Sequence, residues 1–371
     1  MADDHSRLSL DTVLCPAEGL DFVLVSDNEL LVQFGTRSRP SELFRDNDLS
    51  GAIGSVVRAL QSGPSTLGEV LLSLPHEQRD EARQLIESLV EQGVISEAAR
   101  DSVQQYIRYT FTGESSISGS RVALVGAGPI GARIARNLLQ QGIARLWLAD
   151  SRLIDTAWQG SALFGAPQPA DLGRPAQMVL AEHLRSSHEN VEALEWADGS
   201  AVEVGVANAD LVVLALEQPD MQLSHAVNRA CIGAGKPWLS AVIDGNRGLI
   251  GPLFSPPDTA CYNDYQLLAR AAMPSGAMAR KHRQHVLANG RTSFAVGLPG
   301  YADIVAGHCA IAAAHFLIRG ASHLLGRVMT VDFDGMQIDV EDVLKLPRCP
   351  VCATRRIAYR PPFPEYMDQA V

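Results

Sequence analysis

The stretch RVALVGAGPIGARIARNLLQQGIARLWLADSRLID, residues 121–155, decides the fold of this 371-residue chain. An apolar, β-branched run opens it, and Gly126, Gly128 and Gly131 follow at G-x-G-x-x-G spacing. Apolar residues then recur with the period of a helix, and a second apolar run occupies residues 146–149. The stretch therefore predicts a strand, a glycine turn, a helix and a second strand, which together open a βαβ fold.

The three glycines and one acid have the pattern of a dinucleotide-binding turn. The first glycine allows the tight bend, the second lets a ligand approach the backbone, and the third lets helix and strand pack closely. The helix N-terminus offers N–H groups to a phosphate. Asp150 lies about 20 residues past the glycines, where an acid can hold a ribose hydroxyl. Two interpretations stay open: Gly126, Gly128, Gly131 and Asp150 bind a nucleotide, or the glycines serve packing alone.

Composition excludes several classes of protein. A hydrophobic content of 46% and a charged content of 20% are ordinary for a soluble globular protein. A net charge of −11 argues against nucleic acid as the main partner, because a phosphate backbone attracts a basic surface. We find no apolar run near the roughly 18 residues of a membrane span, and no signal peptide. We therefore expect a cytoplasmic protein that does not enter a membrane.

Strands and helices continue to alternate beyond the glycine turn. Residues 209–216 form a nearly continuous apolar run, which is typical of a buried parallel strand. Residues 276–290 are basic and predict an exposed helix or loop, whereas residues 301–320 predict an apolar helix able to pack on the sheet or on a second copy of the chain. The alternation predicts a Rossmann-type, doubly wound α/β sheet over residues 120–353, followed by a tail over residues 354–371.

A smaller α+β domain is expected before the glycine turn. After a loose lead-in over residues 1–18, residues 19–97 predict a hairpin, a third strand, three helices and a short returning strand, an arrangement like a winged helix. The third helix, residues 76–92, carries five acids against two arginines, which excludes a phosphate-facing surface. Residues 98–119 end in a Gly/Ser-rich run and are expected to link the two domains.

This small domain resembles the PqqD-like module called the RiPP recognition element, most clearly in the phrase LIESLVEQGVI. In that family a leader peptide adds a strand to the exposed sheet edge and lies against the third helix, which is β-augmentation. The resemblance places the edge at Leu43 and Phe44, and the helix face at Arg83, Ile86 and Val90. The alternative is that the apolar residues among them belong to the core of the domain.

The larger domain resembles the ThiF/MoeB superfamily over nearly all of residues 120–353. The motifs GAGPIG, LFG, DLGRP, ADLVVLAL, GPLFSPPDTACYND and LPRCPVC occur in the order and spacing of that superfamily. Its members adenylate the C-terminal carboxylates of ubiquitin-like proteins and of some peptides, and they are usually homodimers, which implies a homodimer here. With the PqqD-like front, the chain most resembles the ThiF-like leader-binding subunit of azole-forming peptide cyclodehydratases.

The sequence departs from the adenylating members where they hold phosphate. Their Asn and Arg-Gln after the ribose acid correspond here to Ala157, Gly160 and Ser161, their lysine to Ala176, and their metal-binding Asp to Glu217. Adenylation needs cations on the phosphates, because its transition state concentrates negative charge there. We therefore expect the fold to be kept for binding, without ATP or Mg²⁺.

Four residues are candidate ligands of a structural zinc ion. Cys349 and Cys352 have the C-x-x-C spacing of half a Zn²⁺ site, and six cysteines in a chain of this size do not indicate a disulfide framework. The resemblance places the other half at Cys261 and Asp264, where an acid replaces a second cysteine. Two states stay open: a filled site that ties the C-terminal segment to the fold, or a degenerate and empty one.

Three functions remain in consideration. In the first, the chain is a scaffold that holds the leader of a ribosomally made precursor and docks a YcaO-type ATP-dependent cyclodehydratase, which forms azolines. In the second, the chain is itself an adenylating enzyme, in which the glycine turn holds ATP·Mg²⁺ and Arg133, Arg152 or Arg174 supplies charge. The third, an NAD-dependent oxidoreductase, shares the glycine turn but is disfavoured by the motifs after residue 155. The missing cations favour the scaffold.

Overall fold

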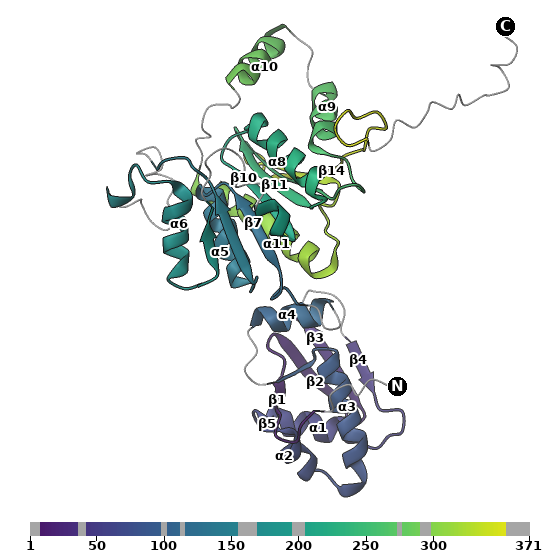
Figure 1. Cartoon of the computed structure of the whole chain (residues 1–371). Helices are drawn as coiled ribbons and strands as arrows, with labels where there is room; N and C mark the ends of the chain where they lie inside the picture. The colour runs from purple at the N-terminus through teal and green to yellow at the C-terminus, as the bar shows by residue number, and fades with distance from the viewer. Residues whose placement is uncertain are drawn as a thin grey trace, which may run out of the picture. The chain divides into compact units, whose positions relative to one another are not determined.

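The computed structural model describes residues 8–35, 42–97, 102–111, 116–154, 169–194, 205–272, 277–289 and 298–353 (Figure 1). The chain divides into two compact units, Met1–Ser116 and Ile117–Val371. The division falls within residues 98–119, where the sequence predicts a linker. Each unit has an apolar core of its own, as expected of two domains.

The first unit contains two small antiparallel sheets and several helices. One sheet has the order β2 (Leu20–Ser26), β3 (Glu29–Phe34), β4 (Glu42–Arg45), and the other has the order β5 (Ser65–Thr66), β1 (Val13–Pro16), β6 (Ile95–Glu97). The helices are α1 (Ala52–Gln61), α2 (Leu67–Leu72), α3 (Arg79–Glu91) and α4 (Ser102–Phe111), and a 3₁₀ turn covers His76–Gln78. The hairpin, the third strand and the three helices predicted within residues 19–97 are confirmed.

Local sequence explains how these helices begin and what they bury. The Thr66 hydroxyl accepts from the Glu69 N–H at 3.1 Å, and the Glu69 carboxylate accepts from the Thr66 N–H at 2.8 Å. This capping box starts α2. On α1, Ile53, Val57 and Leu60 recur at helical spacing and are buried. They pack with the inner face of β2 and β3 and with α3 into one core.

Two segments of this unit differ from expectation. The lead-in expected to be loose over residues 1–18 contains β1, which pairs with β5 and with β6, and Leu14 of β1 is fully buried. The expected linker contains α4, in which Phe111 is buried. β1 has four residues and its partners are distant in sequence, so a local pattern of residues does not indicate it.

An eight-stranded sheet forms the centre of the second unit (Figure 1). In spatial order its strands are β14 (Gln337–Asp342), β13 (Arg327–Asp332), β12 (Arg247–Phe254), β11 (Trp238–Asp244), β10 (Leu211–Leu216), β7 (Arg121–Val125), β8 (Arg145–Ala149) and β9 (Val191–Ala193). Neighbours from β11 to β9 are parallel, and neighbours from β11 to β14 are antiparallel. The predicted Rossmann-type α/β fold is confirmed.

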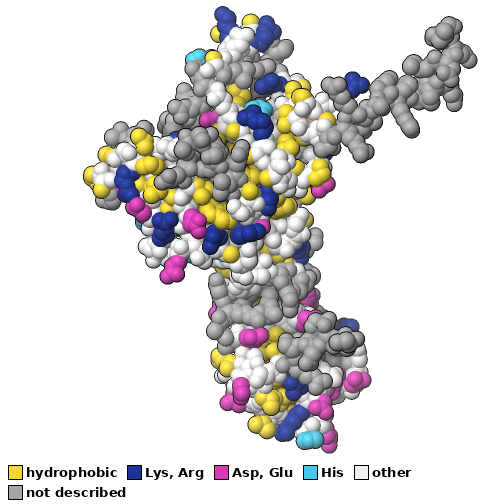
Figure 2. All heavy atoms as spheres, in the orientation of Figure 1, with side chains coloured by type: hydrophobic (Ala, Val, Ile, Leu, Met, Phe, Trp, Pro, Cys, Tyr) yellow, Lys and Arg dark blue, Asp and Glu magenta, His cyan; other side chains and the backbone are white. Residues whose placement is uncertain are grey.

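The helices of the second unit are α5 (Pro129–Gln140), α6 (Ala176–Arg185), α8 (Met221–Ala234), α9 (Tyr262–Ala272), α10 (Ala277–Asn289) and α11 (Pro299–Arg319). Of these, α5, α6 and α8 pack on the parallel strands, and α11 packs on β11 and β12. All six residues of the central strand β10 are buried, as in parallel sheets covered on both faces. Lys and Arg side chains gather over α10 (Figure 2), where Arg280 and Lys281 are exposed, so the predicted basic helix is confirmed.

The expectation that no apolar run approaches the length of a membrane span is wrong for α11, which is long and apolar enough to cross a membrane, judged by length and composition alone. The helix packs instead on α5 and on strands β11 and β12. Its Val305, Ala306 and Cys309 are buried, while Ile311 is 48% exposed. Such packing is typical of a helix that covers the sheet of an α/β fold.

Candidate functional site

The glycine turn joins β7 to α5 and depends on close backbone contacts. Gly126 has a φ of +103°, and a Cβ at this position would lie 1.9 Å from the carbonyl oxygen of Ala215. A Cβ on Gly131 would lie 1.9 Å from the carbonyl oxygen of Gly126. No side chain fits at such distances, so these two glycines are required for the bend and for the packing of α5, as the spacing predicts.

Gly128 lies against a side chain and not against backbone. A Cβ there would lie 2.2 Å from Oε1 of Glu217, the residue that follows β10. Glu217 is 4% exposed, and its Oε1 accepts a hydrogen bond from the Ile130 N–H, in the first turn of α5, at 3.3 Å. The space that the second glycine of a dinucleotide-binding turn leaves for a ligand is therefore taken by a side chain of the protein itself.

Asp150, the predicted ribose ligand, follows β8 and is 6% exposed. Its Oδ2 accepts from the Ala127 N–H at 2.7 Å. The Arg152 guanidinium donates to Oδ1 through Nε at 2.8 Å and to Oδ2 through Nη2 at 2.6 Å. Both carboxylate oxygens of Asp150 are thus engaged within the chain.

Arg152 links Asp150 to Glu217, because its Nη1 donates to Oε2 of Glu217 at 3.1 Å. We call Asp150, Arg152 and Glu217 the Arg152 triad. Burial lowers the pKa of Arg152, but hydrogen bonds and charge from the two carboxylates outweigh burial and raise it. Burial raises the pKa of Glu217; the charge of Arg152 opposes this rise, and the charge of Asp150 adds to it.

The Arg152 triad predicts a pH dependence of stability. A carboxyl group whose pKa is raised by folding stabilises the fold below its unfolded pKa, and this contribution is lost as pH rises through the folded pKa. The ordinary pKa of Glu217 is 4.5, and folding raises it. We therefore expect Glu217→Gln to gain stability relative to the unmodified protein as pH rises above 4.5, by up to about 1.4 kcal/mol per pH unit.

Urea unfolding of both proteins at several pH values between about 4.5 and 8 measures this difference. Glutamine keeps an oxygen that can accept from the Ile130 N–H, so the variant removes the titrating group with little change of shape. A difference that is constant with pH, or that falls as pH rises, would contradict the raised pKa of Glu217.

A second cluster brings together the four predicted zinc ligands. The Sγ atoms of Cys261, Cys349 and Cys352 and a carboxylate oxygen of Asp264 all lie within 4.8 Å of one another. The sulfurs of Cys261 and Cys349 are 3.7 Å apart, and the Cys352 thiol donates to Oδ2 of Asp264 at 3.2 Å. The cluster joins the start of α9 to the segment that follows β14.

The donor set of this cluster fits a tetrahedral cation. Three thiols and one carboxylate are ligand types that Zn²⁺ accepts. Asp264 is fully buried, and its Oδ1 has no hydrogen-bond partner in the described part of the chain; such an oxygen is costly to bury unless a cation or a donor compensates it. Burial raises the pKa of the Cys261 and Cys352 thiols, so metal binding there has to release protons.

The predicted peptide-binding residues divide into two groups. Leu43 is 43% exposed on β4, an end strand of its sheet, and Arg83 on α3 is partly exposed. Phe44 packs in part against the core. Ile86 and Val90 are 0% and 6% exposed within that core, so their placement on a peptide-contacting surface is wrong. The two residues are four positions apart on α3, so they lie on the same face of the helix, which is turned to the core. Both are therefore core residues, as the alternative interpretation expected.

The arginines considered as sources of positive charge are all paired. Arg133 pairs with Asp303, Arg174 pairs with Glu182, and Arg152 lies within its triad. Each guanidinium is therefore neutralised by at least one carboxylate of the chain. A phosphate would have to compete with those carboxylates for the same donors.

The structure describes only some of the residues at which the sequence departs from the adenylating members. Ala176 is buried at the start of α6 and supplies no charge. Ala157, Gly160 and Ser161 lie outside the described residues. The ion pair between Arg152 and Glu217 was not predicted from the sequence. The available signal was an arginine two residues past the ribose acid together with an acid after β10.

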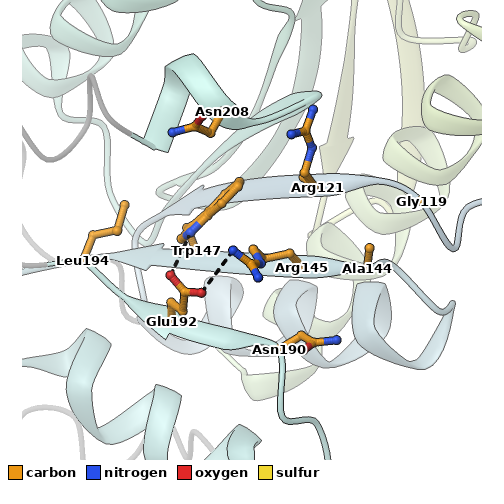
Figure 3. A pocket seen from close by; sticks show the side chains of 9 residues that line it. All are labelled: Gly119, Arg121, Ala144, Arg145, Trp147, Asn190, Glu192, Leu194 and Asn208. Atoms are coloured by element: carbon orange, nitrogen blue, oxygen red, sulfur yellow. Dashed lines mark hydrogen bonds and ion pairs between the residues drawn. The ribbon is translucent and has the colours of Figure 1, made fainter.

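A pocket of about 670 Å³ lies at the amino ends of β7, β8 and β9 (Figure 3). The Arg145 guanidinium lies 5.8 Å from the ring centroid of Trp147, and Glu192 accepts from the Trp147 Nε1–H at 3.2 Å. Arg145 also pairs with Glu192, and Arg121 pairs with Asp210. Because ligands of doubly wound sheets bind at the carboxyl ends of the strands, we assign this pocket no part in the site.

A ThiF family model matches residues 103–352. The chain belongs to the ThiF family. The match covers the glycine turn, the Arg152 triad and the cysteine cluster, and it confirms the superfamily resemblance of the larger domain. No curated protein matches the chain.

Solved structures resemble this ThiF-family protein over most of its length. E. coli MccB with MccA-N7isoASN is 19% identical, with a TM-score of 0.62, and the likeness covers 92% of this chain and 99% of that chain. E. coli MccB with ATP is 18% identical, with a TM-score of 0.61 and the same coverage. PaaA is 16% identical, with a TM-score of 0.58, over 89% of this chain and 100% of that chain. At these identities the likeness shows the fold alone.

Proposed function

We propose that this protein is a leader-peptide-binding scaffold for the modification of a ribosomally made peptide. The first unit holds the leader of the precursor. The ThiF domain docks a YcaO-type ATP-dependent cyclodehydratase, which closes Cys, Ser or Thr side chains of the core peptide onto the preceding carbonyl to form azolines. Holding the leader makes the encounter between core peptide and active site intramolecular and so raises its effective concentration.

The observation that carries this proposal is the open edge of β4. Among the described strands β4 pairs with β3 alone. Val23, Leu31 and Leu43 are aligned across β2, β3 and β4, and Val23 and Leu43 are 47% and 43% exposed. An extended peptide can pair its backbone with such an edge and place apolar side chains against this row. A structure of similar fold is the microcin C7 biosynthetic enzyme MccB in complex with N-formylated MccA.

The state of the glycine turn favours a scaffold over an enzyme. Ala127 and Ile130 donate their N–H groups to Asp150 and Glu217, and Arg152 is bound by the same two carboxylates. Phosphoryl and adenylyl transfer depend on cations and donors that are directed at the phosphates. In this chain the Arg152 guanidinium and the two N–H groups are already bound to carboxylates.

An adenylating enzyme that acts on its own bound peptide is the second candidate. Its support is the intact glycine turn and the similar fold of MccB, which was solved with ATP. Reconstitution separates the two functions. A scaffold leaves the precursor unmodified with ATP·Mg²⁺ and acts only when the partner enzyme is added. Modification by the chain alone, or peptide-dependent exchange of pyrophosphate into ATP, would establish the enzyme and overturn the scaffold.

Three further properties belong to the same proposal. The protein binds one structural Zn²⁺ through Cys261, Asp264, Cys349 and Cys352, which ties the segment after β14 to α9. It forms a homodimer, for which the partly exposed face of α11 around Ile311 offers apolar contact. It works in the cytoplasm, where its precursor is made.

Leader binding predicts different results for the two outer strands of the β2–β3–β4 sheet. Leu43→Glu places a charge on the proposed edge, and we expect the affinity for the leader to fall at least about tenfold. Val25→Glu is the matched control, because Val25 is 56% exposed on β2, the edge strand opposite β4. We expect this control to bind the leader as the unmodified protein does.

Fluorescence anisotropy with a labelled leader peptide measures both variants. Each substituted residue is exposed, so neither variant is expected to lose more than about 0.5 kcal/mol of stability. Equal losses of affinity in the two variants would point to a general effect of charge. No loss in Leu43→Glu would remove the β4 edge as the leader site.

A further inference from the structure

Glu217 makes the contacts at the start of α5 that a bound phosphate group makes in a nucleotide-binding turn. Its Oε1 accepts from the Ile130 N–H at 3.3 Å, and its Oε2 accepts from the Arg152 guanidinium at 3.1 Å. Backbone N–H groups of a first helical turn and an arginine are the donors that anions use. Pro129, the first residue of α5, has no N–H to offer a second anion.

The same carboxylate also fills the space in front of the turn. A Cβ on Gly128 would meet Oε1, Cδ and Oε2 of Glu217 at 2.2, 2.5 and 2.6 Å. The carboxylate is therefore packed directly on the backbone of the second glycine, where a ligand approaches in dinucleotide-binding turns. A phosphate and the Glu217 side chain cannot occupy this position together.

The charge of the Arg152 triad also opposes the binding of a phosphate. The Arg152 triad combines one guanidinium with two carboxylates, and both carboxylates are buried. An incoming phosphate would bring further negative charge beside them, in surroundings where screening by water is weak. Removing Glu217 would take one carboxylate from the triad and would remove the acceptor that Glu217 offers to the Ile130 N–H.

We propose that Glu217 is the residue that excludes nucleotides from this protein, by acting as an internal substitute for a phosphate group. The glycine turn, Arg152 and the start of α5 still form a cradle for the phosphate of a nucleoside triphosphate, and a single side chain keeps it closed. This inference rests on the proposed scaffold function, because it explains how a ThiF fold is kept from binding the ATP that the partner enzyme uses.

Calorimetric titration with ATP·Mg²⁺, and separately with inorganic phosphate, tests the proposal on the full chain. We expect no binding by the unmodified protein at ligand concentrations up to about 1 mM. We expect Glu217→Ser to bind ATP·Mg²⁺ at least about tenfold more tightly than the unmodified protein does. Glu192→Ser is the matched control: it removes one carboxylate from the same unit, at the opposite ends of the strands, and is expected to bind no ATP.

Two results would overturn the proposal. One is tight binding of ATP by the unmodified protein, and the other is no gain of binding in a Glu217→Ser protein that circular dichroism shows to be folded. If Glu217→Ser does not fold, Glu217→Asn is the test, because it shortens the side chain and keeps an oxygen that can accept from Arg152 without adding a carboxylate ligand for Mg²⁺; an affinity equal to that of the unmodified protein then overturns the proposal. Leader binding by the unmodified protein is measured separately, so a failure of the scaffold function is distinguishable from a failure of this inference.

Discussion

Replacing Gly126 with alanine is expected to unfold the ThiF domain under conditions in which the unmodified protein is folded. The new Cβ would lie 1.9 Å from the Ala215 carbonyl oxygen in β10, and the residue has a φ of +103°. Relief requires β7 and β10 to separate, although these strands pair along the centre of the sheet. We expect a loss of at least about 4 kcal/mol in the free energy of unfolding, the range of severe core disruption.

Tryptophan fluorescence during urea unfolding measures this effect in the ThiF domain. All four tryptophans lie in the second unit, since residues 1–116 contain none. Gly233→Ala is the matched control: Gly233 lies within α8, and a Cβ there meets nothing within 4 Å. Alanine is the better helix former, so this control is expected to gain about 0.5–1 kcal/mol. Equal unfolding midpoints for the two variants would contradict the close contact at Gly126.

Loss of the proposed zinc ion is expected to have the second large effect. Cys349 is 2% exposed and lies 3.7 Å from the sulfur of Cys261. In Cys349→Ala we expect the zinc content to fall from about one ion per chain to none. If the lost ion stabilises the fold by about 4 kcal/mol, the melting temperature of the ThiF domain falls by roughly 8–16 °C.

Elemental analysis and thermal unfolding followed by tryptophan fluorescence test this expectation. Cys231→Ala is the control, because Cys231 is buried in α8 and is not one of the four clustered residues; it should keep its zinc. Zinc should also be lost as pH falls, since protons compete for the thiolates. A protein that carries no zinc when purified without chelators, and whose melting temperature does not change when zinc is added, would show that the cluster is degenerate.

Much of the ThiF domain could be predicted because its signals are local. The apolar run before Gly126, the glycine spacing and the helical period after it each act over a few residues, and all agree with one βαβ unit. The four clustered residues could be predicted only because the superfamily pattern aligns Cys261 and Asp264 with the second half of a metal site. Spacing alone identified Cys349 and Cys352.

The features that could not be predicted from the sequence depend on contacts between segments that are distant in the chain. Arg152 and Glu217 are 65 residues apart in sequence, and their pairing is decided by the order of β10, β7 and β8 in the sheet. On α3, Ile86 and Val90 have the same helical pattern whether they face a core or a peptide. Burial decided between these possibilities, and burial is a property of the assembled unit.

The position of β1 in its sheet has a consequence for how the protein is made. β1 lies between β5 and β6, so the first strand of the unit cannot complete its sheet until residues 95–97 are present. A chain leaving the ribosome therefore carries Leu14, Cys15 and Pro16 without their partners in β6 while some 80 further residues are synthesised, at about 5–20 residues per second. For those seconds β1 is open to chaperones, and the first unit can close only after its last strand has been synthesised.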